Sequence, residues 1–135
     1  MTTEQIISIY NDFNQLYFNN ELPLPNKVEF KFVKKFLGQF SWNGTYKNGG
    51  TCILRMSTAY HLTDFEIEKV IIHEMIHAWQ WVHDYRDAHG RTFKLKATLI
   101  NRKTNHKYSI ARCISIENSV SIKDENKCYK GLIMT

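Results

Sequence analysis

Cysteine and proline are both scarce in this chain of 135 residues, which contains three cysteines and two prolines. Cys52, Cys113 and Cys128 are odd in number and form no Cys-x-x-Cys pair, so the pattern favours a reducing compartment, which we expect to be the cytoplasm. No apolar run approaches the roughly 20 residues that cross a bilayer. The N-terminus also lacks the basic segment of a secretory signal, so we expect no membrane partner.

The chain also lacks internal repeats, low-complexity stretches and any change in composition that would mark a linker. Its length is typical of one domain, and its hydrophobic content of 43% with 13% aromatic residues is enough for one core. We therefore predict a single domain over residues 1–135. Its core is expected at about residues 4–104, followed by a strand-rich extension at residues 105–135.

Acidic residues are almost absent from one segment of the chain. Between residues 86 and 112 there is one acid, Asp87, against eight basic residues, although the net charge of the whole chain is only +5. Such a segment is typical either of a solvated helix face or of a surface that attracts a polyanion such as DNA. The candidate nucleic-acid contacts are Arg91, Lys94, Arg102, Lys103 and Lys107.

Two helices are predicted by the spacing of apolar residues and by a capping motif. Apolar residues recur at intervals of three and four between residues 6 and 17, which predicts an amphipathic helix starting at Thr3. Thr63 followed by Glu66 matches a capping box, in which these side chains satisfy backbone amides at a helix start. A second helix is therefore expected to begin near Asp64.

Alternating apolar residues predict short strands at residues 28–32, 38–42 and 51–57, separated by Gly-containing turns. We expect these strands to form a small antiparallel sheet. Residues 93–100 fit both the strand and the helix period, and their Lys, Leu and Ala content favours a helix. The fold class is therefore α+β. Short C-terminal strands are predicted at residues 110–116, 120–122 and 128–134.

The second predicted helix carries the motif His73-Glu74-Met75-Ile76-His77. Residues four apart lie about 40° apart around a helix, so both imidazoles can reach one ion. Zinc held by neutral imidazoles lowers the pKa of a water to roughly 7, and Glu74 can take the proton as the water attacks a peptide carbonyl. The alternative is that these three side chains are ordinary polar residues without a metal. It is less favourable, because the flanking apolar residues predict burial and a buried polar group without a partner costs roughly 1–3 kcal/mol. We predict a metallopeptidase with one zinc ion.

A catalytic zinc site of this kind needs a third protein ligand. His83 follows His77 by six residues, but without a glycine at position 80 a continuous helix turns its ring roughly 240° away. His89 is the better candidate, because it follows the predicted helix and precedes Gly90, where the chain can turn back toward the metal. The histidines at positions 61 and 106 are more typical of exposed surface residues.

These motifs resemble the SprT-like family of zinc metallopeptidases. The resemblance rests on HEMIHA at residues 73–78 and HGRTF at residues 89–93, with further similarity at residues 10–14 and 38–57. It spans about residues 4–104 and implies a Spartan-type minimal zincin domain. The site residues that it implies are zinc ligands at His73, His77 and His89 and a catalytic glutamate at Glu74.

The resemblance implies a zinc-dependent metalloendopeptidase acting on proteins or peptides, with DNA as a candidate partner and DNA-bound or DNA-crosslinked proteins as candidate substrates. One alternative is a general or regulatory intracellular peptidase without DNA dependence. Another is a catalytically idle, zinc-stabilised nucleic-acid-binding module, against which Glu74 argues because metal binding alone does not need it. Many relatives carry a zinc ribbon with two Cys-x-x-Cys pairs, whereas Cys113 and Cys128 are solitary, so we predict no second zinc.

Overall fold

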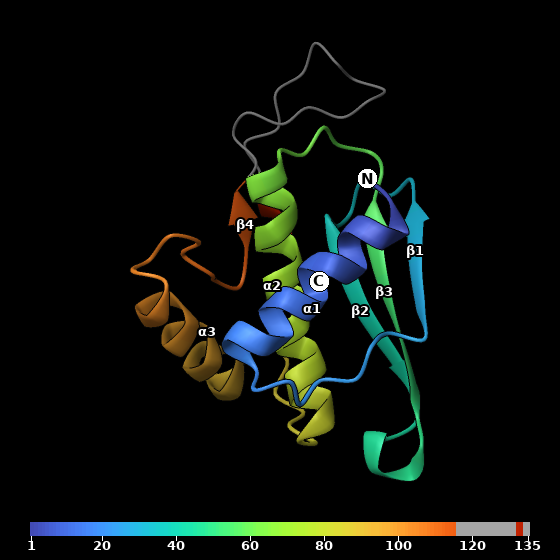
Figure 1. Cartoon of the computed structure of the whole chain (residues 1–135), viewed down its shortest axis with the longest axis vertical. Helices are drawn as coiled ribbons and strands as arrows, with labels where there is room; N and C mark the ends of the chain where they lie inside the picture. Colours follow the sequence, from blue (N-terminus) through green and yellow to red (C-terminus); the bar gives the residue numbers. More distant parts are fainter. Residues whose placement is uncertain (116–131, 134–135) are drawn as a thin grey trace.

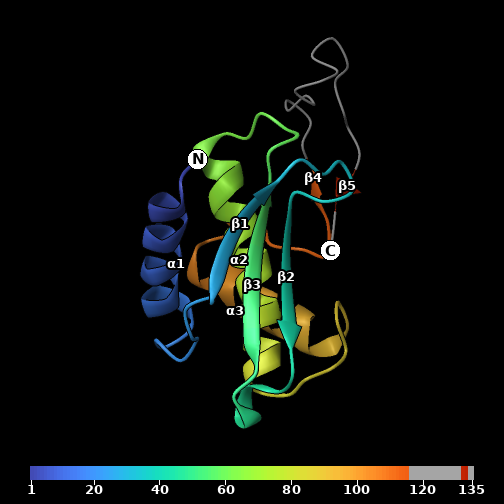
Figure 2. The same ribbon diagram turned by 90° about the vertical axis from the view of Figure 1, so that its right-hand side faces the viewer.

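The structure is a computed structural model that describes residues 1–115 and 132–133. Within these residues a sheet forms one layer and helices cover one of its faces, as Figures 1 and 2 show from two directions. This arrangement confirms the predicted α+β class. The elements are α1 (Thr3–Tyr17), β1 (Lys27–Lys31), β2 (Gly38–Asn43), the short 3₁₀ helix η1 (Tyr46–Asn48), β3 (Thr51–Ser57), α2 (Asp64–Val82), α3 (Arg91–Lys103), β4 (Ile114–Ser115) and β5 (Leu132–Ile133).

The main sheet is mixed, with the strand order β1-β3-β2, and the prediction of a purely antiparallel sheet is wrong. β2 and β3 form an antiparallel pair, but β1 runs parallel to β3. Residues 32–37 connect β1 to β2, which lies at the opposite edge of the sheet. The next strand, β3, then takes the central position between β1 and β2. Apolar alternation predicts that a segment is a strand but not which neighbour it pairs with, and this explains the error.

Helix α1 confirms the predicted N-terminal helix. Its capping box is formed by Thr2 and Gln5, and it buries Ile6, Tyr10 and Phe13 against the rest of the molecule. Just beyond its last turn the chain is held by the buried amide of Asn14, which exchanges hydrogen bonds of 2.9 and 3.2 Å with the backbone of residue 22. The helix therefore serves as a scaffold that covers α2 and the adjacent sheet.

Helix α2 begins where the capping box predicts. The Thr63 backbone N–H donates to Glu66 over 3.0 Å, and the Glu66 backbone N–H donates to the Thr63 hydroxyl over 3.1 Å. Between Val70 and Trp81 most of its side chains are buried, whichever way they face. The reason is that α2 lies between α1, α3 and the sheet (Figure 1), so the segment carrying the metal motif is the central element of the fold.

The ambiguous segment at residues 93–100 is helical, as predicted, and forms the middle of α3. Phe93, Ala97 and Ile100 make its buried face. Of the predicted C-terminal strands, residues 114–115 and 132–133 pair antiparallel as β4 and β5, while residues 110–113 are not in a strand. The strand predicted at residues 120–122 lies outside the described residues, as do residues 116, 128–131 and 134 of the other two predicted strands. No helix of the described part combines the length and the apolar character needed to cross a bilayer.

Candidate metal centre

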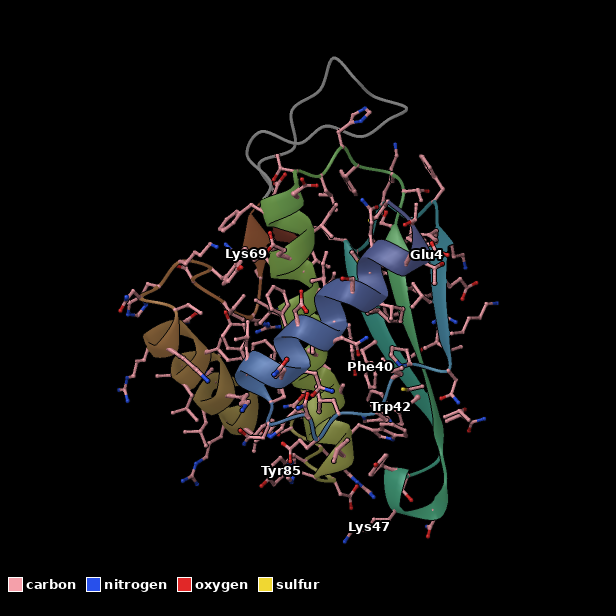
Figure 3. All side chains as sticks on the ribbon, in the orientation of Figure 1. Glu4, Phe40, Trp42, Lys47, Lys69 and Tyr85 are labelled. Atoms are coloured by element: carbon pink, nitrogen blue, oxygen red, sulfur yellow. The ribbon has the colours of Figure 1, made fainter. Side chains whose placement is uncertain are left out.

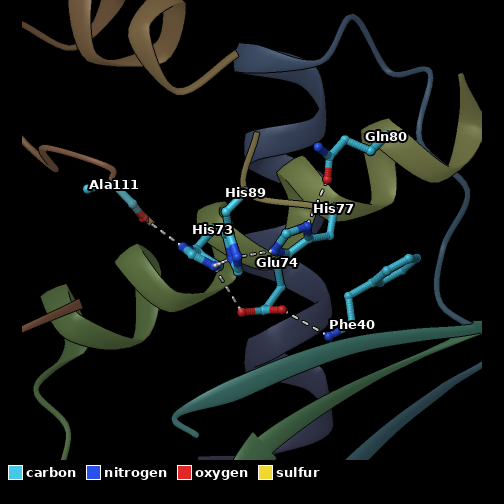
Figure 4. Close-up of polar contacts among 7 residues, drawn as sticks. All are labelled: Phe40, His73, Glu74, His77, Gln80, His89 and Ala111. Carbon is cyan, nitrogen blue, oxygen red and sulfur yellow. Dashed lines mark hydrogen bonds and ion pairs between the residues drawn. The ribbon is translucent and has the colours of Figure 1, made fainter. Parts of the chain in front are cut away.

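Three imidazoles from two segments of the chain meet at one point (Figure 4). His73 and His77 lie one turn apart on α2, and His89 lies in the connection to α3. The Nε2 atom of His89 is 3.1 Å from that of His77 and 3.3 Å from that of His73. Tetrahedral zinc with Zn–N bonds of ~2.0–2.1 Å would place its nitrogen ligands ~3.3–3.4 Å apart. The observed separations are therefore suitable for one ion.

The partners of the Nδ1 atoms determine how two of these rings are protonated. His73 Nδ1 lies 3.0 Å from the Ala111 carbonyl oxygen, and His77 Nδ1 lies 2.8 Å from Oε1 of Gln80. Both partners are acceptors, so each neutral ring carries its proton on Nδ1 and directs the lone pair of Nε2 toward His89. Neutral imidazole nitrogens are good ligands for zinc, so this donor set fits the metal that the motif predicts.

The centre is deep on one side and accessible on the other. His73 is only 1% exposed, whereas His77 and His89 are half-buried. The ring of Phe93, itself 1% exposed, packs against all three imidazoles, with centroid distances of 4.9, 5.1 and 5.0 Å to His73, His77 and His89. Phe93 thus gives the cluster an apolar support, and the half-buried rings of His77 and His89 form its more exposed side.

Glu74 lies beside the cluster and is oriented by the sheet (Figure 4). Its Oε1 atom accepts a 2.9 Å hydrogen bond from the backbone N–H of Phe40 in β2, and Oε2 lies 3.9 Å from His73 Nε2. The residue is 2% exposed. A buried carboxylate held next to a group of metal-binding nitrogens, but not within that group, is suitably placed to act as a general base.

The structure separates the other histidines from this cluster. His83 Nε2 lies 3.1 Å from Glu21 Oε1, and the His83 ring stacks on Tyr85 with a centroid distance of 5.6 Å. His61 and His106 are exposed. Within residues 1–115 and 132–133, the three clustered imidazoles are the only set of three or more ligand side chains close enough to hold an ion. Cys128 lies outside these ranges.

Three groups that orient the site were not predicted from the sequence: the Ala111 carbonyl, the Phe40 amide and the Gln80 side chain. Backbone groups have no signature in the sequence, so the first two could not be found in it. Gln80 did carry a signal, because it is a polar residue in a buried stretch of α2, three residues after a histidine. At that spacing two helical side chains are neighbours.

The predicted nucleic-acid contacts divide into two groups. Arg91, Lys94 and Arg102 are exposed on α3. Lys103 and Lys107 are also exposed, but their ammonium groups lie over aromatic rings, 5.8 Å and 5.1 Å from the respective centroids. Lys96 also packs over aromatic rings, those of Phe18 and Trp79, but it is half-buried, and burial lowers its pKa. The exposed basic residues of α3 are therefore Arg91, Lys94, Arg102 and Lys103, whereas Lys96 is not exposed.

Comparison with known proteins agrees with this architecture. Germ cell nuclear acidic protein of Drosophila melanogaster is 28% identical to the chain over 120 residues, which make up 89% of this chain and 11% of that protein. The chain thus spans about a tenth of the length of this relative. A sequence model of the SprT-like family matches residues 6–114, which include most of α1, the main sheet, α2, α3 and all three clustered histidines. The chain belongs to the SprT-like family.

Proposed function

We propose that the protein is a zinc-dependent metalloendopeptidase in which His73, His77 and His89 hold the zinc ion and Glu74 is the catalytic base. The observation that carries this proposal is the convergence of the three Nε2 atoms next to the buried carboxylate. A purely structural zinc site is normally closed by four protein ligands, whereas three histidines leave one position for water or substrate. Membership of a family of zincin-like, metalloprotease-related domains supports the same function.

The chemistry follows from this geometry. Zinc, when bound, supplies a Lewis acid that polarises a peptide carbonyl and makes water a better nucleophile near neutral pH. Glu74 accepts the proton of the attacking water and then delivers it to the leaving nitrogen. The Phe40 amide holds one oxygen of Glu74, so the other oxygen remains on the side of the histidines. Because both groups are buried, this orientation is maintained before substrate arrives.

The sheet edge offers a place for the substrate. β2 is the edge strand next to α2, and an extended peptide can bind along such an edge as an added strand. Trp42 follows Phe40 on the same face of β2, and its ring, which stacks on that of Phe40 at 6.0 Å, is 58% exposed (Figure 3). An extended, partly apolar segment of a protein is therefore the substrate that this surface favours.

Glu74→Gln separates catalysis from metal binding. The variant is expected to retain zinc, measured by elemental analysis, and to lose about 10²- to 10⁴-fold in the hydrolysis of an unstructured protein, because the proton acceptor is removed. His89→Ala should lose both zinc and activity. His83→Ala, which lies outside the cluster, should keep both and serves as the control. Undiminished hydrolysis by the Glu74→Gln protein would refute the mechanism.

We further propose that DNA-bound proteins are substrates. This part rests on the exposed basic residues of α3 and on a relative whose name describes it as nuclear. DNA bound at this surface would hold a protein on the same DNA near the cluster, and the gain should fall steeply as salt rises, because bound phosphates release counterions. A general peptidase without DNA dependence would cut at the same rate with and without DNA.

The test measures cleavage of a DNA-binding protein with and without DNA at low salt. Replacing both Lys94 and Arg102 with alanine is expected to remove most of the stimulation by DNA, while basal cleavage of a peptide stays unchanged. The matched control replaces Lys31 and Lys35, two exposed lysines from the region of β1, and should keep the stimulation. If DNA does not stimulate the wild type, or if both double variants respond alike, this surface has no such role.

A further inference from the structure

Gln80 is a buried polar residue between the two segments that carry the histidines. It lies on α2, three residues after His77, and is 4% exposed. Its amide oxygen accepts a 2.8 Å hydrogen bond from His77, and its amide nitrogen donates to the Ala88 carbonyl over 2.7 Å and to the Thr92 hydroxyl over 2.9 Å. A side chain that is so fully engaged and so deeply buried is costly to replace.

The orientation of this amide is fixed by its partners. A carbonyl oxygen can only accept, so the nitrogen of Gln80 must face Ala88, and its two hydrogens match the two close acceptors. The oxygen is then directed at His77 Nδ1 and can only accept the N–H of that ring. One amide thereby sets which nitrogen of His77 remains available for a metal.

The other end of the same amide holds the segment that carries His89. Ala88, next to that histidine, has a left-handed backbone with φ of 49°, a conformation that a non-glycine residue needs contacts to maintain. Thr92 extends the connection, because its hydroxyl and its amide both donate to Asp87 and hold the pKa of Asp87 below the ordinary value. Gln80 therefore ties α2 to the turn before α3 on both sides of His89.

We propose that Gln80 is the positioning residue of the metal centre: it fixes the Nδ1–H tautomer of His77 and holds His89 against α2. This inference rests on the proposed zinc function. A glutamine here performs two tasks at once, because an amide offers an acceptor and a donor at fixed separation. Leucine offers neither, and glutamate offers the acceptor alone, since a carboxylate has no hydrogen to donate to the Ala88 carbonyl.

Two variants separate these tasks. Gln80→Leu is expected to weaken zinc binding by about 10- to 100-fold, measured by competition with a chromophoric chelator, as is typical when the group behind a histidine ligand is lost. The tautomer of His77 can be read from ¹⁵N spectra of the zinc-free proteins, recorded well above the ordinary imidazole pKa of about 6.5. Wild type should show the Nδ1–H form of His77, and Gln80→Leu should show the Nε2–H form. Gln80→Glu should preserve the Nδ1–H form, yet speed hydrogen exchange of the Thr92 amide, because the tether to Ala88 is lost.

Asn14→Leu is the matched control, since it removes another buried side-chain amide, on α1. The Asn14 amide makes two hydrogen bonds with the backbone of residue 22 and none with the histidine cluster. It should lower overall stability and leave the zinc affinity of the folded protein within about twofold of wild type. The proposal is overturned if Gln80→Leu keeps both the wild-type His77 tautomer and wild-type affinity. Failure of the wild type to bind zinc would instead refute the proposed function, and the zinc-free spectra would still decide the role of Gln80.

Discussion

The position of Glu74 depends on a residue that has no side chain. Gly38 begins β2, and a Cβ atom added to it would lie 2.5 Å from Cγ1 of Val70 and 3.3 Å from Cγ of Glu74. The first distance is far inside van der Waals contact, so with any other residue at position 38 either β2 or the Val70 side chain on α2 would have to shift. The Phe40 amide that orients Glu74 lies two residues further along the same strand. The absence of a side chain at position 38 is therefore part of the site geometry.

Gly38→Ala is expected to destabilise the protein by about 1–3 kcal/mol, which is typical of overpacking, and to lower kcat by about tenfold or more while zinc content stays unchanged. The reason is that β2 moves and Glu74 loses its amide donor. Gly49→Ala is the control, because the added Cβ meets nothing within 4 Å but is strained by a φ of 76°. That variant should lose stability in urea unfolding and keep its kcat. Equal kcat values for both variants would contradict the positional role of Gly38.

At the scale of whole elements, the sequence predicts features that depend on neighbouring residues, such as helix starts. It does not predict features that depend on distant segments, such as strand pairing. The start of α2 is encoded by Thr63 and Glu66, three residues apart, and the helical nature of residues 93–100 by their composition, and the structure confirms both. The direction of β1 depends on β3, more than 20 residues later, with which Val28 and Leu54 are in register. No periodicity within either strand contains that information.

Thr63→Ala tests whether the start of α2 stabilises the fold without affecting the chemistry. Loss of the hydroxyl leaves the Glu66 amide without its partner, so the free energy of unfolding should fall by about 1 kcal/mol. Hydrolysis should not change, because His73 lies about 15 Å further along the helix. Thr98→Ala, at an exposed position within α3, should be neutral or slightly stabilising. A Thr63→Ala protein with full stability but reduced kcat would contradict the view that the start of α2 affects stability and not catalysis.

At the scale of the whole molecule, the candidate site combines predictable and unpredictable parts. His73 and His77 share a helix face by spacing alone, and His89 joins them from the connection after the helix. The left-handed residues of this connection are Asp84 and Ala88, which come before His89, and not Gly90, which was favoured from the sequence. The groups that orient these rings come from residues as distant in sequence as Ala111, which only the folded chain brings near. Helix geometry thus predicts which side chains converge, whereas their tautomers depend on tertiary contacts.

Because the cluster joins α2 to the turn before α3, zinc should stabilise the entire fold. An ion bound only by the native state adds about 4 kcal/mol of stability at a free concentration 1,000 times its Kd, which corresponds to a rise in Tm of roughly 10–20 °C for a chain of this size. Calorimetry of the wild type with zinc and after chelation measures the difference. His89→Ala should abolish most of the rise, since two imidazoles on one helix cannot link the segments, whereas His83→Ala should retain it. A metal-dependent rise that survives loss of His89 would mean that the ion is held elsewhere, and that the convergence of the three rings is not a metal centre.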